Sequence, residues 1–413
     1  MKTRSIQLLL AAGLLMAGCG SDGVTDPDPK PPTDPDYVAS PAREARAVWV
    51  SRYDWSNRTD LEALIDSVAG ANFNMIYFQA RVRSDAYYAS NIEPWAQALA
   101  GLGQDPGWDP LAVALSRARF HNLEVHVWLN ALIGWCTTSA IPETTPRHVL
   151  LEHPDWVMRT QSGSTTNSEN CTFLSPGVPG VRSHLARVSA DIVRRYNVDG
   201  IHLDYIRYPD ATMSYDSQTV ASYDAAKVGE PTLTYDEHRR RQVTATVREV
   251  RDSIRAARPG AALSAAVWGI YQNTANWSGV STGYGSRFQD SRLWLQQGLI
   301  DAIAPMVYWS VKPTYGERLD FAWLANDFAS HAFGRHVYVG MGVSTPPPEN
   351  FCPGCDVVKQ IYATRRAQAQ GVAVFRARLM HPQGWSALRA GPFPTKVPVP
   401  PMTWLPASNL LAP

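Results

Sequence analysis

The feature that most constrains the fold is a regular alternation of short apolar runs with longer amphipathic stretches along the chain. The apolar runs have the length and composition of buried strands. The stretches between them place apolar residues every three or four positions, as in Asp60–Ala71, so they indicate helices. We expect strands at Ala45–Val50, Asn74–Gln79, Glu124–Leu129, Asp199–Tyr205, Ala262–Trp268, Asp301–Trp309, Arg335–Val343 and Gly371–Leu379. Further helices are expected at Pro110–His121, Val181–Tyr196, Tyr235–Arg258, Arg287–Gln297, Leu319–His331 and Asp356–Gln370.

Eight strands separated by helices predict an α/β fold of the parallel (β/α)8 barrel type. An open doubly wound sheet is the alternative, but it would be expected to show a glycine-rich phosphate loop after an early strand, and none is present. No low-complexity linker interrupts the central part of the chain. We therefore expect one barrel domain over residues 43–390, between a Pro/Asp-rich tether at 19–42 and a Pro-rich, irregular tail at 391–413.

The chain begins with an expected export signal. Residues 1–18 join a basic start to a short apolar core and small residues, as a cleaved signal peptide does. Leu15–Cys19 is similar to a bacterial lipobox, which implies lipidation of Cys19 and an anchor in a membrane of the envelope. An ordinary cleavage site in a secreted protein is the alternative. Gly20 rather than Asp after the cysteine favours the outer membrane, facing the periplasm.

Charge and composition narrow the class of partner. The formal net charge is +1 and charged residues make up 18% of the chain, so electrostatics do not favour nucleic acid. The chain contains 14 Trp and 17 Tyr, and aromatic rings stack well on sugars, although core packing accounts for many of them. No HExxH-type spacing or Asp/His cluster is present, so neither a metal nor a cofactor is expected. The protein is expected to be a monomer.

Four cysteines remain besides Cys19, and in an exported protein they predict disulfides. The simplest pairing is Cys136 with Cys171 and Cys352 with Cys355. A redox motif or half of a zinc site is the alternative for Cys352 and Cys355, but the sequence has no second CxxC.

The segment Val198–Pro209 is the first candidate for chemistry. Apolar Ile201 and Leu203 alternate with His202 and Asp204, so a period of two places the two polar side chains on one face of a strand. In a barrel these side chains can point into the mouth, where water and substrate reach them. Asp204 is therefore the first candidate for a catalytic carboxylate. The alternative is a buried aspartate held by Arg207 or by a backbone N–H.

Other polar and aromatic side chains are expected on the same rim, because catalytic and binding residues of such barrels lie at the C-terminal ends of strands. Together they suit a neutral or weakly acidic polyhydroxylated ligand. Each of them alone is weak evidence, because an arginine at the rim can simply neutralise a carboxylate, and a His or Glu inside a barrel is more often a satisfied core residue than a catalyst. The expected substrate-binding residues are Gln79, Arg81, Trp128, Asn130, His202, Arg207, Trp268, Tyr308 and Trp309.

Several segments together resemble the glycosyl-hydrolase-like 10 family over about residues 43–385. They are Arg46–Val50, Phe73–Arg81, Glu93–Trp95, His126–Asn130, Asp199–Pro209 and Pro305–Trp309. The resemblance implies a (β/α)8 barrel, a bacterial envelope location and action on glycan, with peptidoglycan sugar strands as the favoured substrate. Many members have a second acid directly after the position of Asp204, where this chain has Tyr205.

Glycoside hydrolysis needs two carboxyl groups, and their separation predicts the stereochemical outcome. Asp204 is the first, and we expect Asp85 or else Glu93 as its partner, since both follow the second strand. The seventh strand ends without an acid. Arg81, Arg207, Asn130, Tyr308 and Trp309 would hold hydroxyl, carboxylate or N-acetyl groups. The alternatives to an envelope hydrolase are a glycan-binding lipoprotein without catalysis and a hydrolase of another polysaccharide.

Overall fold

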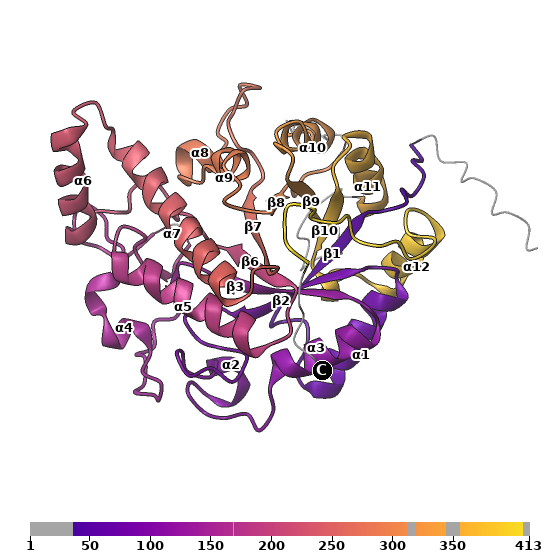
Figure 1. The fold of residues 1–413 in the computed structure, drawn as a ribbon, viewed down its shortest axis with the longest axis horizontal. Coiled ribbons are helices and arrows are strands. Elements are labelled where there is room, and N and C mark those ends of the chain that lie inside the picture. Colours follow the sequence, from indigo (N-terminus) through magenta and orange to yellow (C-terminus); the bar gives the residue numbers. More distant parts are fainter. Residues whose placement is uncertain (1–35, 168, 312–318, 344–355, 408–413) are drawn as a thin grey trace, which may run out of the picture. The chain divides into compact units, whose positions relative to one another are not determined.

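The computed structural model describes residues 36–167, 169–311, 319–343 and 356–407, and these lie in one compact unit. Eight parallel strands close into a barrel, and each strand pairs with its neighbours in chain order (Figure 1). This confirms the predicted (β/α)8 barrel. The barrel strands are β1 (Ala45–Val50), β2 (Met75–Arg81), β3 (Glu124–Asn130), β6 (Gly200–Asp204), β7 (Ala262–Trp268), β8 (Ala302–Met306), β9 (His336–Gly342) and β10 (Gly371–Phe375).

The helices surround this barrel (Figure 1). They are α1 (Arg58–Gly70), α2 (Gln97–Ala100), α3 (Pro110–Phe120), α4 (Val149–Glu152), α5 (Pro179–Arg195), α6 (Ser217–Gly229), α7 (Tyr235–Ala257), α8 (Gly283–Ser286), α9 (Ser291–Gln296), α10 (Phe321–Ala329), α11 (Val357–Arg366) and α12 (Pro382–Ala390). The seven predicted helices correspond to α1, α3, α5, α7, α9, α10 and α11. The sequence reading missed α6 and α12, and also the short helices α2, α4 and α8. No helix in the described part of the chain has both the length and the apolarity needed to cross a membrane.

Helix α1 shows how the local sequence specifies these elements. Asn57 caps its N-terminus by accepting a hydrogen bond from the backbone N–H of Asp60. Leu61, Ile65 and Val68 recur at helical spacing and are fully buried against the barrel. The predicted stripe is therefore the face that packs on the sheet.

The strands separate two apolar layers. Outward-facing residues such as Ile201 and Leu203 of β6 pack against the helices. Inward-facing residues fill the barrel with a second, smaller core that includes Trp49 and Tyr77. The alternation expected for β6 is confirmed. His202 and Asp204 lie on the inward side of the strand, whereas Ile201 and Leu203 face the helices.

A long insertion follows β3 at the C-terminal end of the barrel. Residues 131–178 contain the antiparallel pair β4 (Ile133–Trp135) and β5 (Thr172–Phe173), together with α4. A disulfide joins Cys136 to Cys171 within this insertion, with a Cα–Cα distance of 4.1 Å. This confirms one predicted disulfide. The predicted signal peptide, the lipidation of Cys19, the first part of the tether and the Cys352–Cys355 pair lie outside the described residues.

The C-terminal tail lies at the opposite, N-terminal end of the barrel. Residues 391–407 have no helix or strand. The backbone N–H of Glu44, just before β1, donates to the carbonyl of Pro398 at 3.1 Å, and Asn74, just before β2, donates to the carbonyl of Val397 at 2.9 Å. Trp404 donates from Nε1 to Asp301, just before β8, at 2.8 Å. The tail thus covers the end of the barrel where the strands begin.

Candidate active site

A cavity of about 550 Å³ lies at the C-terminal ends of the barrel strands. Side chains at or near the ends of β1, β2, β3, β6, β8 and β10 contribute to its walls, together with the insertion that follows β3. Six of the residues predicted for catalysis or binding line it: Gln79, Trp128, Asn130, Asp204, Arg207 and Tyr308. The cavity occupies the place where barrel enzymes of this type hold their substrates.

Asp204 is the last residue of β6 and is 7% exposed. Its Oδ1 accepts a hydrogen bond from the backbone N–H of Tyr205 at 2.6 Å and lies 3.3 Å from Nη1 of Arg207. Burial raises the pKa of Asp204, while Arg207 and the N–H of Tyr205 oppose that shift. Asp204 therefore has the contacts of a held carboxylate and also faces the cavity.

Tyr205 turns the chain sharply at the end of the strand. Its φ is +50°, a left-handed conformation that bulky residues rarely adopt. The ring faces the guanidinium of Arg207, whose Cζ lies 4.2 Å from the ring centroid, and Tyr205 lines the cavity. The position after Asp204, where the family resemblance implies a second acid, is thus occupied by an aromatic wall residue.

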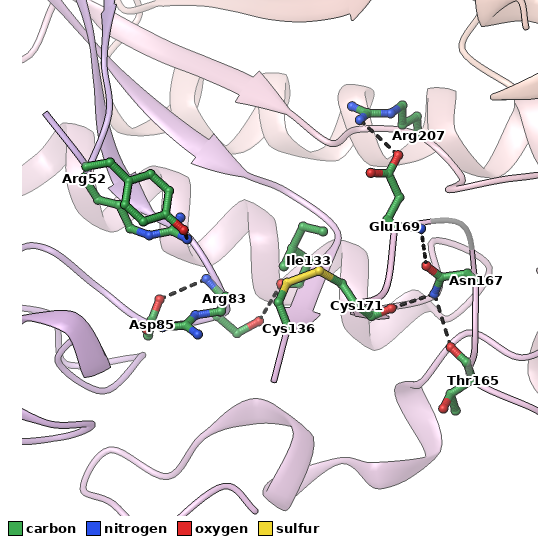
Figure 2. Close-up of a disulfide and its surroundings, with 12 residues drawn as sticks. Arg52, Arg83, Asp85, Ile133, Cys136, Thr165, Asn167, Glu169, Cys171 and Arg207 are labelled. Atoms are coloured by element: carbon green, nitrogen blue, oxygen red, sulfur yellow. Dashed lines mark hydrogen bonds and ion pairs between the residues drawn. A yellow bond between two sulfur atoms is a disulfide. The ribbon is translucent and has the colours of Figure 1, made fainter. Parts of the chain in front are cut away.

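Arg207 links Asp204 to a carboxylate that the sequence reading missed. Nη2 of Arg207 lies 3.5 Å from Oε1 of Glu169, and Nη1 of Arg287 lies 3.7 Å from the same oxygen. Glu169 belongs to the insertion after β3, two residues before Cys171 (Figure 2). The predicted disulfide was the one sequence signal close to it.

Amide side chains form a connected polar group in the cavity wall. Gln79 accepts hydrogen bonds from Ser51 Oγ at 3.3 Å and from the backbone N–H of Arg52 at 3.1 Å. Asn130 Oδ1 accepts from Trp128 Nε1 at 2.9 Å and lies 3.5 Å from Nε2 of Gln79. These contacts hold the amide groups of Gln79 and Asn130 in fixed orientations. The donors and acceptors that remain free to bind a ligand are therefore also fixed in direction.

Positive charge dominates the residues that line the cavity. Four of them are arginines, Arg52, Arg83, Arg207 and Arg376, whereas Asp204 is the one acid among the described lining residues. Arg376 is paired with the buried Asp54. Planar guanidinium groups bind carboxylates with two parallel hydrogen bonds and also contact amides and hydroxyls.

The two expected partners of Asp204 do not line the cavity. Asp85 is fully buried, and its oxygens accept from the backbone N–H groups of Arg83 at 2.9 Å and Gln97 at 3.2 Å. Glu93 is 1% exposed and is bound by Arg81 at 2.9 Å and by His184 at 2.9 Å. Burial alone would raise the pKa of Glu93, but Arg81 and His184 outweigh burial and lower the pKa to about 2. A catalytic carboxyl group must reach the substrate, so these positions argue against the role expected for either residue.

Two predicted binding residues, Arg81 and His202, support the site from behind. Arg81 is fully buried and donates to the backbone carbonyls of Asn130 and Ala131. His202 is fully buried, accepts from Trp49 Nε1 at 3.2 Å and lies 2.9 Å from Ser264 Oγ through Nδ1. Because the indole N–H only donates, Nε2 of His202 must accept, and burial lowers the pKa of His202 well below its usual value. Neither side chain contacts the cavity.

Two predicted tryptophans also lie outside the cavity wall. Trp268 donates to the carbonyl of Ser281 at 2.8 Å, and its ring faces Arg287 with a Cζ-to-centroid distance of 4.1 Å. The carbonyl of Trp309 accepts from Gln360 at 2.9 Å, and its ring packs on the outer apolar core. The periodicity that identified the strand ends did not distinguish rings in the wall from rings that support it.

The sequence profile of the glycosyl hydrolase-like 10 family matches residues 44–349. Glycosyl hydrolase YngK of Bacillus subtilis is 29% identical over 321 residues, which cover 72% of this chain and 60% of YngK. Glycosyl hydrolase DigH of Escherichia coli is 28% identical over 340 residues, which cover 73% of this chain and 74% of DigH.

Solved structures show the same fold at low identity. The glycoside hydrolase domain of PgaB (BpsB) from Bordetella bronchiseptica has a TM-score of 0.59 at 14% identity and covers 85% of this chain and 99% of that chain. The catalytic domain of beta-amylase from Paenibacillus polymyxa has a TM-score of 0.55 at 12% identity, with 86% and 98% covered. Since the family profile spans most of the barrel, the chain belongs to the glycosyl hydrolase-like 10 family.

Proposed function

We propose that this protein is a glycoside hydrolase that cleaves a bacterial cell-wall glycan, with peptidoglycan sugar strands as the substrate. The main support is the carboxyl group of Asp204, which lines the cavity and whose pKa burial raises. A carboxyl group that keeps its proton above the usual pH range is suited to protonate the oxygen of a leaving sugar. The family membership and the names of the two relatives are consistent with this chemistry.

The composition of the cavity wall supports a glycan as the ligand. Trp49, Trp128 and Tyr308 supply aromatic surface, which suits the apolar C–H faces of sugar rings. Gln79 and Asn130 supply amide groups, and the four arginines suit carboxylate and N-acetyl groups, both of which peptidoglycan sugars bear. A cavity of about 550 Å³ has the size of an ordinary small-ligand site.

We also propose that a lipid on Cys19 anchors the protein in the envelope, at the outer membrane facing the periplasm. The support is the sequence of residues 1–20. Cells that produce the protein would be labelled with radioactive palmitate and fractionated, with Cys19→Ser as the control. Label in the wild type alone, in the outer-membrane fraction, is the expected result. Equal labelling of both proteins, or of neither, would contradict the anchor.

The hydrolase proposal is tested with purified peptidoglycan glycan strands, with and without stem peptides. Wild type and Asp204→Asn are incubated with each substrate, and new reducing ends are identified by mass. We expect release by the wild type and release lowered about 1,000-fold in Asp204→Asn, because the amide cannot supply the proton.

A glycan-binding protein without catalysis is the second candidate, because Asp204 is the one acid among the described residues that line the cavity. Retention of both proteins on the strands without any new reducing end would favour it. Cleavage of a different polysaccharide, with peptidoglycan untouched, would favour a hydrolase of that polymer.

A further inference from the structure

We propose that Glu169 is the second carboxylate of this site and that the Cys136–Cys171 disulfide holds it beside Asp204. The inference rests on the proposed hydrolase function and names the partner that hydrolysis needs. It replaces the expected partners Asp85 and Glu93, which are enclosed at 0% and 1% exposure. Glu169 is not itself in the cavity wall, but its side chain is 24% exposed and lies against Arg207, which is in that wall.

Glu169 reaches the site through a shared arginine. One nitrogen of the Arg207 guanidinium lies 3.5 Å from Glu169 Oε1, and another lies 3.3 Å from Asp204 Oδ1. Both nitrogens belong to one small planar group, so the two carboxylates lie within about 10 Å of each other, which includes the separations of roughly 5–9.5 Å used by glycosidases. Figure 2 shows the Glu169 carboxylate directed at Arg207.

The position of Glu169 is constrained by its own loop. The backbone N–H of Glu169 donates to Asn167 Oδ1 at 3.0 Å, and Asn167 Nδ2 donates to the carbonyl of Cys171 at 2.6 Å. Cys171 is bonded to Cys136, directly after β4, and is followed by β5, which pairs with β4. Figure 2 shows Asn167, Glu169 and Cys171 beside the disulfide, with both of these hydrogen bonds drawn. Both cysteines also line the cavity, so the covalent link joins the Glu169 turn to the cavity wall.

The environments of the two acids assign their roles. Asp204 is almost enclosed, and burial favours its protonated form, so it donates. The Glu169 side chain is 24% exposed and open to water, so it accepts. Water attacks the anomeric carbon and passes one proton to Glu169 as the new C–O bond forms. The glycosidic C–O bond breaks, and the leaving oxygen takes the proton of Asp204. The two carboxyl groups then exchange protons with solvent and regain their starting states.

The test uses the purified protein and peptidoglycan glycan strands. Glu169→Gln is compared with wild type, with Asp204→Asn and with Glu152→Gln, a control in the same insertion whose side chain is 58% exposed. We expect kcat to fall about 100-fold or more in Glu169→Gln and to be unchanged in Glu152→Gln. Sodium azide, a small anion that needs no base, should restore turnover in Glu169→Ala and yield a glycosyl azide.

The disulfide is tested separately with Cys136→Ser/Cys171→Ser. Loss of the link should lower kcat about 10-fold by misplacing Glu169, and a phosphine reductant should lower the wild type to the same level without affecting the double variant. Melting temperatures and binding to strands are measured for every variant, so that unfolding is not read as lost catalysis.

Each outcome decides the question. Full kcat in Glu169→Gln beside an active wild type would overturn the role of Glu169 and leave the hydrolase proposal standing. A loss without azide rescue, accompanied by lost strand binding, would assign Glu169 to holding Arg207 instead. An inactive wild type on all glycans would overturn the proposed function and this inference together.

Discussion

The two ends of the barrel use charged residues in different ways. At the N-terminal end, acids are enclosed by donors: Asp301 is 2% exposed and accepts from Arg255 at 2.6 Å, from the backbone N–H of Leu263 at 2.7 Å and from Trp404 at 2.8 Å. At the C-terminal end, Asp204 accepts from one backbone N–H and one arginine and faces a cavity. Both aspartates are nearly buried, but Asp301 accepts three hydrogen bonds from the surrounding fold, whereas Asp204 accepts two and faces the cavity.

This difference shows that burial alone does not identify a functional acid. A buried charge whose lone pairs are all used contributes to the stability of the fold, and removing it leaves its donors unpaired. A buried acid with spare capacity toward a cavity can interact with a ligand instead. Glu93 illustrates the distinction. It follows β2, a strand that ends at the cavity, but it is enclosed by Arg81 and His184.

The largest expected effect is that of Asp204→Asn, at the C-terminal end of the barrel. We expect kcat on glycan strands to fall about 1,000-fold, within the range for loss of a general acid, with little change in melting temperature. Reducing-end release and thermal melting measure the two quantities. An active Asp204→Asn enzyme would show that the acid at the C-terminal end is no more involved in catalysis than the acids at the N-terminal end.

Glu93 should contribute to stability rather than to catalysis, like the enclosed Asp301 at the N-terminal end of the barrel. Its folded pKa of about 2 lies below the ordinary value of 4.5, so its stabilising contribution is fully present above about pH 4.5 and is lost as the pH falls from about 4.5 to about 2. We expect Glu93→Gln to lower the free energy of unfolding by about 3 kcal/mol at pH 7, with the gap from wild type closing over that window. Urea unfolding at a series of pH values measures it. A gap that does not depend on pH would contradict this reading.

An Asp→Asn substitution at the N-terminal end of the barrel should affect stability alone. Asp301→Asn removes a charge that is 2% exposed, while its partner Arg255 is 25% exposed and can be solvated. We therefore expect a loss of about 2 kcal/mol, below the usual cost of breaking a fully buried pair, with kcat unchanged. Chemical denaturation and strand cleavage test this, and a fall in kcat at a temperature where the variant is folded would break the comparison.

The smallest effect is expected from Trp404→Phe in the tail. The substitution keeps the ring over Arg335 but removes the hydrogen bond to Asp301, which should cost about 1 kcal/mol. Activity should be unaffected. A loss of 3 kcal/mol or more would mean that the tail stabilises the barrel through more than this bond.

The barrel could be predicted because the spacing of apolar residues that identifies a strand or a helix can be recognised within a short segment of the chain. The bounds of β1 and β7 agree with the prediction, and those of the other strands differ by a few residues at most at either end. Alternation along β6 also placed Asp204 at the mouth, since a period of two needs no knowledge of the rest of the chain. Helix α6 was missed because Thr219 is its one buried residue, so it lacks the apolar stripe that the reading relied on.

The partners of each acid were decided by tertiary structure. Asp85 and Glu93 follow the same strand, but whether either is open depends on donors from α5 and from nearby backbone. Glu169 lies beside Arg207 in an insertion in which a disulfide joins two residues 35 positions apart. The sequence by itself determined the strand order, the inward face and the position of Asp204, since these follow from local periodicity. Which carboxylates are enclosed and which face the cavity depends on contacts between distant segments, and only the folded chain brings those together.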